Sequence, residues 1–206
     1  MDSPNDKSTF SILMSVHDQA DELQRFMPQL LTQQLEAPYQ VIVVDESSTD
    51  NTADVLKRLK ADYSHLYTTF LPQYRFQQNR RRLSFTIGAK AANCQWVILT
   101  DVSTTPQNDH WLQKLQEFAT GSTTLMLGYV KRKTDDVRLR TYDDISQARS
   151  IITKAEQWRA NIGHAGLMHA IRRSTHYDFI VVRADHAHEL LRLFALDPCM
   201  KVKKER

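Results

Sequence analysis

The sequence predicts an α/β domain with a mostly parallel central sheet flanked by helices. Its 206 residues are enough for one such domain with a full hydrophobic core. Hydrophobic residues make up 41% and charged residues 25%, which excludes the disordered, collagen-like and disulfide-framework classes. The main observation is that short apolar runs alternate with helical patterns, as in chains that build parallel sheets from β-α-β units.

Two strand-and-helix units open the chain. The apolar run at 10–16 predicts a buried strand, and the next apolar residues recur at helical spacing up to Pro38. The β-branched run at 39–44 predicts a second buried strand, because it is too short for a helix. Side-chain oxygens at 47–50 suit the cap of a following helix, whose apolar positions are Ala53, Leu56 and Leu59.

The same alternation continues to residue 129, after which the character of the chain changes. We expect strands at 66–71, 96–100 and 125–129 and helices at 83–92 and 109–119. Further on, we expect a charged loop at 131–140, a long helix at 142–161, strands at 167–171 and 179–182, and a helix containing Leu190, Leu191 and Leu193.

The charge distribution limits the classes of partner. The net charge of +3 comes partly from the arginines at 80–82 and from the basic residues at 201–206. Clusters of this kind are usually solvated surface, and no long basic stripe with interleaved aromatics suggests a nucleic-acid interface. Anionic small ligands and membrane phosphates stay open as partners. The arginines at 80–82 are best interpreted as a solvated loop, and the alternative is that they meet a diphosphate or an anionic acceptor.

The cysteines and the apolar runs bear on the compartment. Cys94 and Cys199 are the only cysteines and lack the spacing of a zinc site or of a disulfide framework, which favours a reducing compartment. No signal peptide and no run of about 18 apolar residues is found. We therefore expect a cytoplasmic protein, with peripheral association at the inner face of the membrane as the alternative.

Two aspartates stand directly after predicted strands. Asp45 follows the second strand, and Asp101 follows the strand at 96–100. In open parallel sheets, ligands bind beyond the carboxyl ends of the strands. A carboxylate there can accept hydrogen bonds from a nucleoside or ligate a divalent cation. The alternative is that each aspartate caps the next helix.

The residues around these strand ends resemble family 2 glycosyltransferases. The likeness lies in three successive blocks, of which the second is the most diagnostic: Ser11-Ile-Leu-Met-Ser-Val-His17, Val41-Ile-Val-Val-Asp-Glu-Ser-Ser-Thr-Asp-Asn-Thr52 and Ile87-Gly-Ala-Lys-Ala-Ala-Asn-Cys-Gln-Trp-Val-Ile-Leu-Thr-Asp101. The resemblance implies a single GT-A domain over 1–206, with a nucleotide-sugar-binding half at 9–129 and a weakly matched acceptor-side half at 130–206.

The resemblance also implies an activity and a set of site residues. The activity is inverting transfer of a sugar from a UDP or GDP sugar to a glycan or lipid acceptor in polysaccharide or glycolipid assembly, assisted by Mg²⁺ or Mn²⁺. By motif position, Val16 and Asp45 would line the nucleobase pocket, and Ser47 would also bind the nucleotide sugar. Lys90 would approach the donor, and Asp101 would hold both the donor and the metal.

The chain departs from the family pattern in two places. Where the family has a second metal-binding aspartate, this chain has Ser103, which lowers the charge available for a cation. The best match to the family's catalytic base is Asp185, with His186 as a chemical substitute. Asp185 is equally suited to cap the following helix. The family's QxxRW-type element is not visible.

Two other interpretations are open, and the departures favour the first of them. A catalytically degenerate GT-A domain would bind a nucleotide or a protein partner without turnover. A nucleotidyltransferase has a related sheet with carboxylates at strand ends, but the glycine-rich basic loop expected near its N-terminus is absent from this sequence. No GxGxxG or GxxxxGK[ST] motif indicates a nicotinamide-dependent enzyme or a P-loop NTPase.

Overall fold

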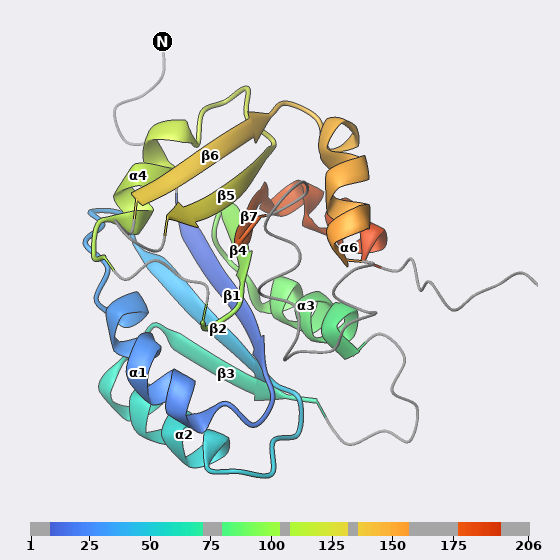
Figure 1. Cartoon of the computed structure of the whole chain (residues 1–206). Helices are drawn as coiled ribbons and strands as arrows, with labels where there is room; N and C mark the ends of the chain where they lie inside the picture. The colour runs from blue at the N-terminus through green and yellow to red at the C-terminus, as the bar shows by residue number, and fades with distance from the viewer. Residues whose placement is uncertain (1–8, 72–79, 104–107, 132–135, 157–176, 195–206) are drawn as a thin grey trace, which may run out of the picture.

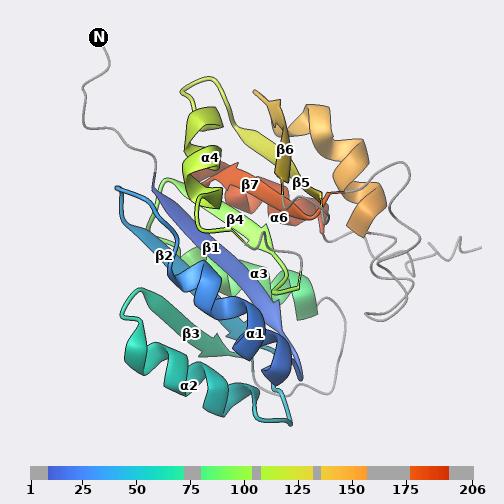
Figure 2. The same cartoon turned by 60° about the vertical axis from the view of Figure 1, so that its left-hand side comes forward.

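The fold is a seven-stranded sheet with helices on both faces (Figure 1). The computed structural model describes residues 9–71, 80–103, 108–131, 136–156 and 177–194. The strand order is β3-β2-β1-β4-β7-β5-β6, which can be followed across the sheet in Figure 2. Chain order and spatial order differ, because the chain crosses from β3 at one edge back to β4 beside β1.

The first four strands form the parallel part of the sheet. They are β1 (Phe10–Val16), β2 (Tyr39–Asp45), β3 (Leu66–Phe70) and β4 (Trp96–Thr100), paired as β3-β2-β1-β4. β1, β2 and β4 are almost continuously apolar because helices cover them on both faces. All four strands end at one edge of the sheet, called here the carboxyl edge, and begin at the opposite amino edge.

The other three strands are antiparallel to their neighbours. β7 (Phe179–Arg183) pairs with both β4 and β5 (Leu125–Lys131), and β6 (Asp136–Tyr142) pairs with β5. The sheet is therefore mixed. The charged loop expected at 131–140 is wrong, since β6 begins within it. Arg138 and Arg140 are exposed while alternate residues turn inward, the pattern of an edge strand with one wet face.

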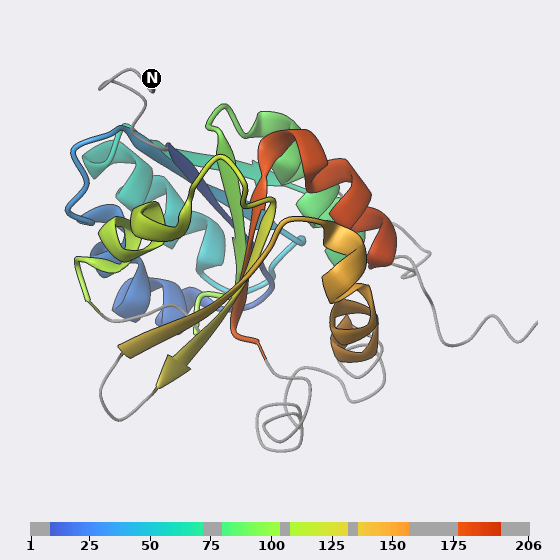
Figure 3. The same cartoon turned by 90° about the horizontal axis from the view of Figure 1, so that it is seen from above.

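Helices cover the sheet in two layers (Figure 3). One face carries α1 (Ala20–Leu31), α2 (Thr52–Asp62) and α4 (Trp111–Phe118). The other carries α3 (Arg80–Ala91), a helical segment at 145–156 and α6 (Ala187–Leu193). None of the helices in the described ranges combines the length and the apolar character needed to span a bilayer.

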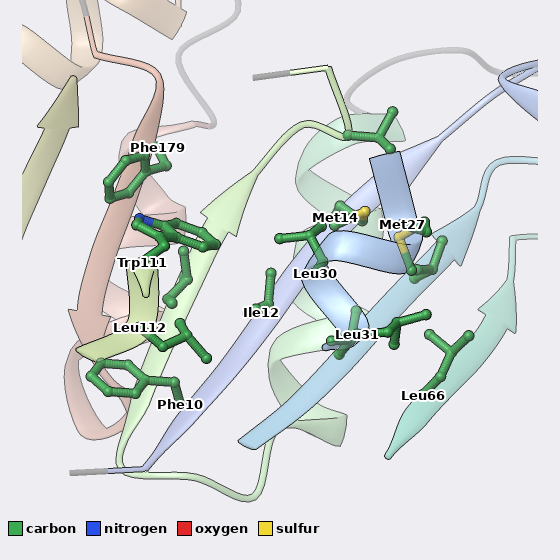
Figure 4. Close-up of a cluster of buried hydrophobic side chains, with 14 of the residues drawn as sticks. Phe10, Ile12, Met14, Met27, Leu30, Leu31, Leu66, Trp111, Leu112 and Phe179 are labelled. Carbon is green, nitrogen blue, oxygen red and sulfur yellow. The ribbon is translucent and has the colours of Figure 1, made fainter. Parts of the chain in front are cut away.

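Each face of the sheet has its own hydrophobic core, because successive strand residues point to opposite sides. In β1, Ile12 and Met14 pack towards α1, whereas Leu13 packs towards α3. Figure 4 shows the first of these cores, where Trp111 of α4 lies against Phe179 of β7 with ring centroids 5.1 Å apart. The core is thus continuous from the parallel strands into the antiparallel ones.

Most element boundaries agree with the prediction, with one change that matters for the site. Helix α3 begins at Arg80, three residues before the expected start, so that it includes the arginines at 80–82. The long helix expected at 142–161 is helical over 145–156. Tyr142 belongs to β6 and residues 143–144 form a bend, so the helix starts later than expected. Its part after residue 156 and the strand expected at 167–171 lie outside the described residues.

Candidate functional site

Asp45 and Asp101 lie on the same edge of the sheet, on either side of the end of β1. Val16, the last residue of β1, is paired in register with Asp45. On its other side, Met14 is paired with Thr100, the residue before Asp101. Because adjacent strands are about 4.8 Å apart, the two backbones are separated by roughly 10 Å across the end of β1. A ligand seated beyond β1 can therefore meet both carboxylates.

Asp45 is almost buried and organises the turn that follows it. The residue is 8% exposed, and its Oδ1 accepts hydrogen bonds from the Ser48 amide at 2.9 Å and the Ser48 hydroxyl at 2.6 Å. Ser47, which lies between Asp45 and Ser48 in the chain, has a φ of 63°, and its hydroxyl donates to the Leu71 carbonyl. The turn keeps the residues after β2 at the carboxyl edge.

The β1–α1 and β2–α2 loops are joined at the same edge. Asp18 adopts a φ of 50°, and its Oδ1 accepts hydrogen bonds from the Thr49 amide at 2.6 Å and the Asp50 amide at 3.3 Å. In return, the Asp18 amide donates to Ser48 Oγ at 2.9 Å. The hydrogen bond from the Thr49 backbone lowers the pKa of Asp18 below its ordinary value. These bonds hold the two loops beside Val16 and Asp45.

Glu46, which the sequence analysis did not identify, links the end of β2 to the start of α3. Because it follows Asp45, it turns to the opposite face of the sheet. There it accepts hydrogen bonds from Ser15 Oγ and, at 2.7 Å, from Ser84 Oγ. The Arg80 side chain approaches it with Nε 3.6 Å from Oε2 and donates from Nη2 to the Glu46 carbonyl at 2.6 Å. An acidic residue directly after a strand-end aspartate was the available signal.

Asp101 is paired with Arg81, the second residue of α3. Arg81 Nη1 lies 2.9 Å from Asp101 Oδ1, and Arg81 Nε lies 3.5 Å from Glu156 Oε2. The guanidinium also lies over the Phe85 ring, 4.6 Å from its centroid. Tyr177 donates a hydrogen bond to Glu156 at 2.9 Å. The Arg81 side chain is thus held between two carboxylates that come from different parts of the chain.

The arginines at 80–82 are therefore not the solvated loop expected from their charge. The Arg80 and Arg81 side chains are 23% and 29% exposed, and both belong to ion pairs in the first turn of a helix. A cluster of basic residues gives the same sequence pattern whether its side chains are solvated or ion-paired. The structure resolves this ambiguity by bringing α3 against the ends of β2 and β4.

The side chains around Asp101 fit a divalent cation poorly. Hard cations prefer several oxygen ligands, including one or two carboxylates. Within the described ranges, no group of three or more His, Cys, Asp or Glu side chains is placed to hold a metal. Ser103 replaces the second carboxylate of the motif, and the Asp101 carboxylate already lies against a guanidinium. A cation at Asp101 would have to displace Arg81.

Asp185 lies at the opposite edge from Asp45 and Asp101. Arg183, the last residue of β7, is paired with Trp96, the first residue of β4, and the Ala184 amide donates to the Gln95 carbonyl at 2.8 Å. The expectation that Asp185 is the base for a reaction at Asp101 is therefore wrong, because β7 runs antiparallel to β4. The helix-cap alternative is also wrong, since α6 begins after His186 without a side-chain cap.

Lys90 is also remote from the two carboxylates. It lies in the last turn of α3, ten residues after Arg80, which corresponds to about 15 Å along a helix axis. Helix α3 starts at the carboxyl edge and leads towards β4 at the amino edge, and the Lys90 side chain is exposed. Lys90, which was expected to approach the donor, lies at the far end of this helix. The basic residues near the strand ends are Arg80 and Arg81.

Comparison with known proteins identifies the family. Mannosyltransferase PcManGT from Pyrobaculum calidifontis, solved with GDP-Man and Mn²⁺, is 13% identical, with a TM-score of 0.58 over 91% of this chain and 48% of that chain. TarS from S. aureus is 18% identical, with a TM-score of 0.49 over 60% of this chain and 36% of that chain. TarS in complex with UDP-GlcNAc is 19% identical, with a TM-score of 0.47 over 60% and 34%.

The likeness to PcManGT is one of fold, and it confirms the GT-A architecture that the sequence resemblance implies. This chain spans about half the length of PcManGT. No match was found among curated proteins. The profile of glycosyl transferase family 2 matches residues 11–187, which is most of the chain. The chain therefore belongs to glycosyl transferase family 2.

Proposed function

We propose that this chain is a glycosyltransferase that takes a sugar from a nucleoside diphosphate sugar and transfers it to a glycan or lipid acceptor with inversion. The observation that carries the proposal is the position of Asp45 and Asp101, on one edge of the sheet and on either side of the end of β1. Family membership supports it. The complex of PcManGT with GDP-Man agrees with a donor of this class.

In this proposal the nucleoside binds at the end of β2. Uracil and guanine both present ring N–H donors, which a carboxylate accepts. Asp45 supplies that acceptor, Val16 supplies an apolar wall, and the turn through Ser47 forms the rim. From there the diphosphate extends across the end of β1 towards Asp101 and the first turn of α3. The separation of roughly 10 Å between the two strands agrees with the step from a base to a diphosphate.

The chemical step is an in-line displacement at the anomeric carbon. The acceptor hydroxyl loses its proton to a base, its oxygen forms the new bond to the anomeric carbon, and the bond from that carbon to the diphosphate oxygen breaks on the opposite side. The leaving nucleoside diphosphate keeps the electron pair, so positive groups beside it stabilise the transition state. The acceptor would be bound by the half at 130–206. The catalytic base that takes the proton of the acceptor hydroxyl must reach the carboxyl edge.

The donor-binding part of the proposal is tested with Asp45→Asn. The amide oxygen can still accept from Ser48, so the turn is preserved, but the other oxygen becomes an NH₂ group that faces the donors of the base. Titration calorimetry with UDP and GDP should show affinity reduced by about tenfold or more for the preferred nucleotide, the loss expected for a hydrogen bond to a charged group. Unchanged affinity would contradict this role of Asp45.

Asp185→Asn is the matched control for this substitution. It removes the same charge by the same chemical change, at an exposed position on the amino edge. Its affinity for UDP and GDP should stay within about twofold of the wild type, because a charge separated from the ligand by the length of the sheet is largely screened by salt. Equal losses in the two variants would indicate a general effect of net charge.

A second candidate function is nucleotide binding without turnover. It is favoured by Ser103 in place of a carboxylate and by the position of Asp185 away from the carboxyl edge. The two functions are separated by incubating the full chain with UDP-GlcNAc or GDP-mannose and measuring the release of nucleoside diphosphate. Sustained release that is lost in Asp45→Asn supports the transferase, whereas binding without release supports the degenerate domain.

A further inference from the structure

The ion pair between Arg81 and Asp101 occupies the position where the family pattern implies a metal. Arg81 lies between Asp101, at 2.9 Å, and Glu156, at 3.5 Å. Asp101 is the one carboxylate of the motif that this chain retains, and Glu156 comes from the helical segment at 145–156, more than fifty residues later. Two carboxylates and one cation therefore meet at this point of the carboxyl edge, and the cation is a guanidinium.

The surroundings of Arg81 keep its guanidinium in place. The Phe85 ring, one turn further along α3, lies 4.6 Å from it, and the Glu156 side chain is only 9% exposed. Tyr177 fixes Glu156 by donating a hydrogen bond at 2.9 Å. A guanidinium held in this way presents planar N–H donors that match the oxygens of a phosphate, and little conformational entropy is lost when it binds.

The first turn of α3 brings a second guanidinium to the same place. Arg80 is the residue before Arg81, and its side chain reaches Glu46 at the end of β2. The twelve-residue helix α3 begins here, so its positive dipole end also faces the carboxyl edge. The two arginines thus lie against the two strand ends that flank β1, where the diphosphate of the donor extends in the proposed function.

We propose that Arg81, positioned by Asp101 and Glu156, binds the donor diphosphate in place of a divalent cation, with Arg80 beside it. The inference rests on the proposed function and assigns a residue to it. Asp101 then acts as a positioning residue for Arg81 and not as a metal ligand. When the bond to the anomeric carbon breaks, the guanidinium stabilises the charge on the leaving diphosphate, and donor binding becomes independent of metal.

The test is titration calorimetry of UDP and GDP with the full chain, in EDTA and in Mn²⁺. The wild type should bind its preferred nucleotide with affinities that agree within about threefold in the two conditions. Arg81→Ala should bind at least tenfold more weakly in EDTA, and Arg81→Lys should lie between, because a lysine keeps the charge but not the planar fork. Arg82→Ala, one residue along and turned by about 100° on the helix, is the matched control and should bind within about threefold of the wild type.

The outcomes separate this inference from the proposed function. Binding by the wild type only in Mn²⁺, or undiminished binding by Arg81→Ala in EDTA, overturns the role of Arg81 and leaves the transferase proposal intact. Absence of nucleoside diphosphate binding in both conditions overturns both. Circular dichroism verifies that each variant is folded, and Arg81→Gln, which keeps the carbons up to Cδ and a polar end without the charge, replaces Arg81→Ala if that variant unfolds.

A second measurement needs no nucleotide. If the guanidinium occupies the cation position, its removal vacates the place between the Asp101 and Glu156 carboxylates, and Mn²⁺ should then bind there. Electron paramagnetic resonance of free Mn²⁺ should show at least tenfold tighter binding to Arg81→Gln than to the wild type. Equal Mn²⁺ affinities would contradict the proposal, because Arg81 would then not compete with a metal for this position.

Discussion

The parallel and antiparallel parts of the sheet differ in where their strand ends lead. β1, β2 and β4 all end at the carboxyl edge, so that Asp45 and Asp101 lie on either side of one ligand position although they are 56 residues apart in sequence. β7 lies directly beside β4 but runs the other way, and the residue that follows it, Ala184, is bonded to Gln95 at the amino edge. An acidic residue after a strand marks a shared site only when the strands are parallel.

The two parts also differ in how charge is used at the strand ends. At the carboxyl edge, carboxylates accept hydrogen bonds from loops or pair with arginines of α3. At the end of β7, Asp185 pairs with Arg183 at 3.7 Å, and the two side chains are 62% and 40% exposed. An exposed pair of this kind contributes little to stability or binding. Partly buried, multiply bonded carboxylates are therefore the better indicator of a site in this molecule.

The largest expected effect is on the packing that joins the two parts. Gly128 of β5 is paired with Phe179, and a Cβ added there would lie 2.0 Å from the Phe179 ring, which is itself wedged against Trp111. Gly128→Ala should destabilise the protein by about 2 kcal/mol through overpacking. For a chain of this size, that lowers Tm by roughly 4–8 °C, measured by thermal unfolding.

Gly121→Ala is the control for this substitution, since a Cβ there would meet no atom within 4 Å. A single shifted transition in Gly128→Ala would show that the antiparallel strands unfold together with the parallel ones. Two separate transitions, or a Tm equal to that of Gly121→Ala, would contradict a single core that spans both parts.

An effect of intermediate size is expected when the pH is lowered and Asp18, in a loop of the parallel part, takes up a proton. The pKa of Asp18 is lowered below its ordinary value of 3.8, first by the hydrogen bond from the Thr49 amide. A lowered folded-state pKa contributes stability that is present above the ordinary value and is lost as pH falls through the folded value. The amide resonance of Thr49 should therefore shift with a midpoint below pH 3.8. In Asp18→Asn that transition should be absent. A midpoint at or above pH 3.8 would contradict the link between the two loops.

The smallest expected effect is at the surface of the antiparallel part. Lys114 of α4 approaches Asp136 of β6 at 2.7 Å, but the two side chains are 38% and 45% exposed. Solvent and salt screen such a pair, so Lys114→Ala should change Tm by no more than about 2 °C. A larger Tm shift that high salt reverses would show that exposed ion pairs in the antiparallel part contribute more to stability than expected.

The parallel part of the fold could be predicted from sequence because its strands are local patterns. The apolar runs at 10–16, 39–44 and 96–100 are buried on both faces and bounded by polar residues, and this information is present in each segment alone. β6 was missed because an edge strand with one wet face carries arginines at alternate positions, and its charge resembles that of a loop.

The candidate site could be predicted only where it depends on the parallel strands. Asp45 and Asp101 could be placed on one edge because parallel strands share their direction. The direction of β7 depends on which neighbour it pairs with, a non-local fact, so the edge on which Asp185 lies could not be inferred. The roles of Arg80, Arg81 and Glu46 likewise depend on how α3 packs against two strand ends, which the identity of those residues does not specify.

Amide chemical-shift mapping with the preferred nucleoside diphosphate tests the central claim most directly. The account predicts that saturating nucleotide shifts the resonances of Val16, Ser48 and Asp101, which belong to three separate segments on the carboxyl edge, and leaves those of Ala184 and Asp185 on the amino edge unchanged. Shifts confined to the amino edge, or shifts around only one of the two strand-end carboxylates, would contradict a single site built across the end of β1.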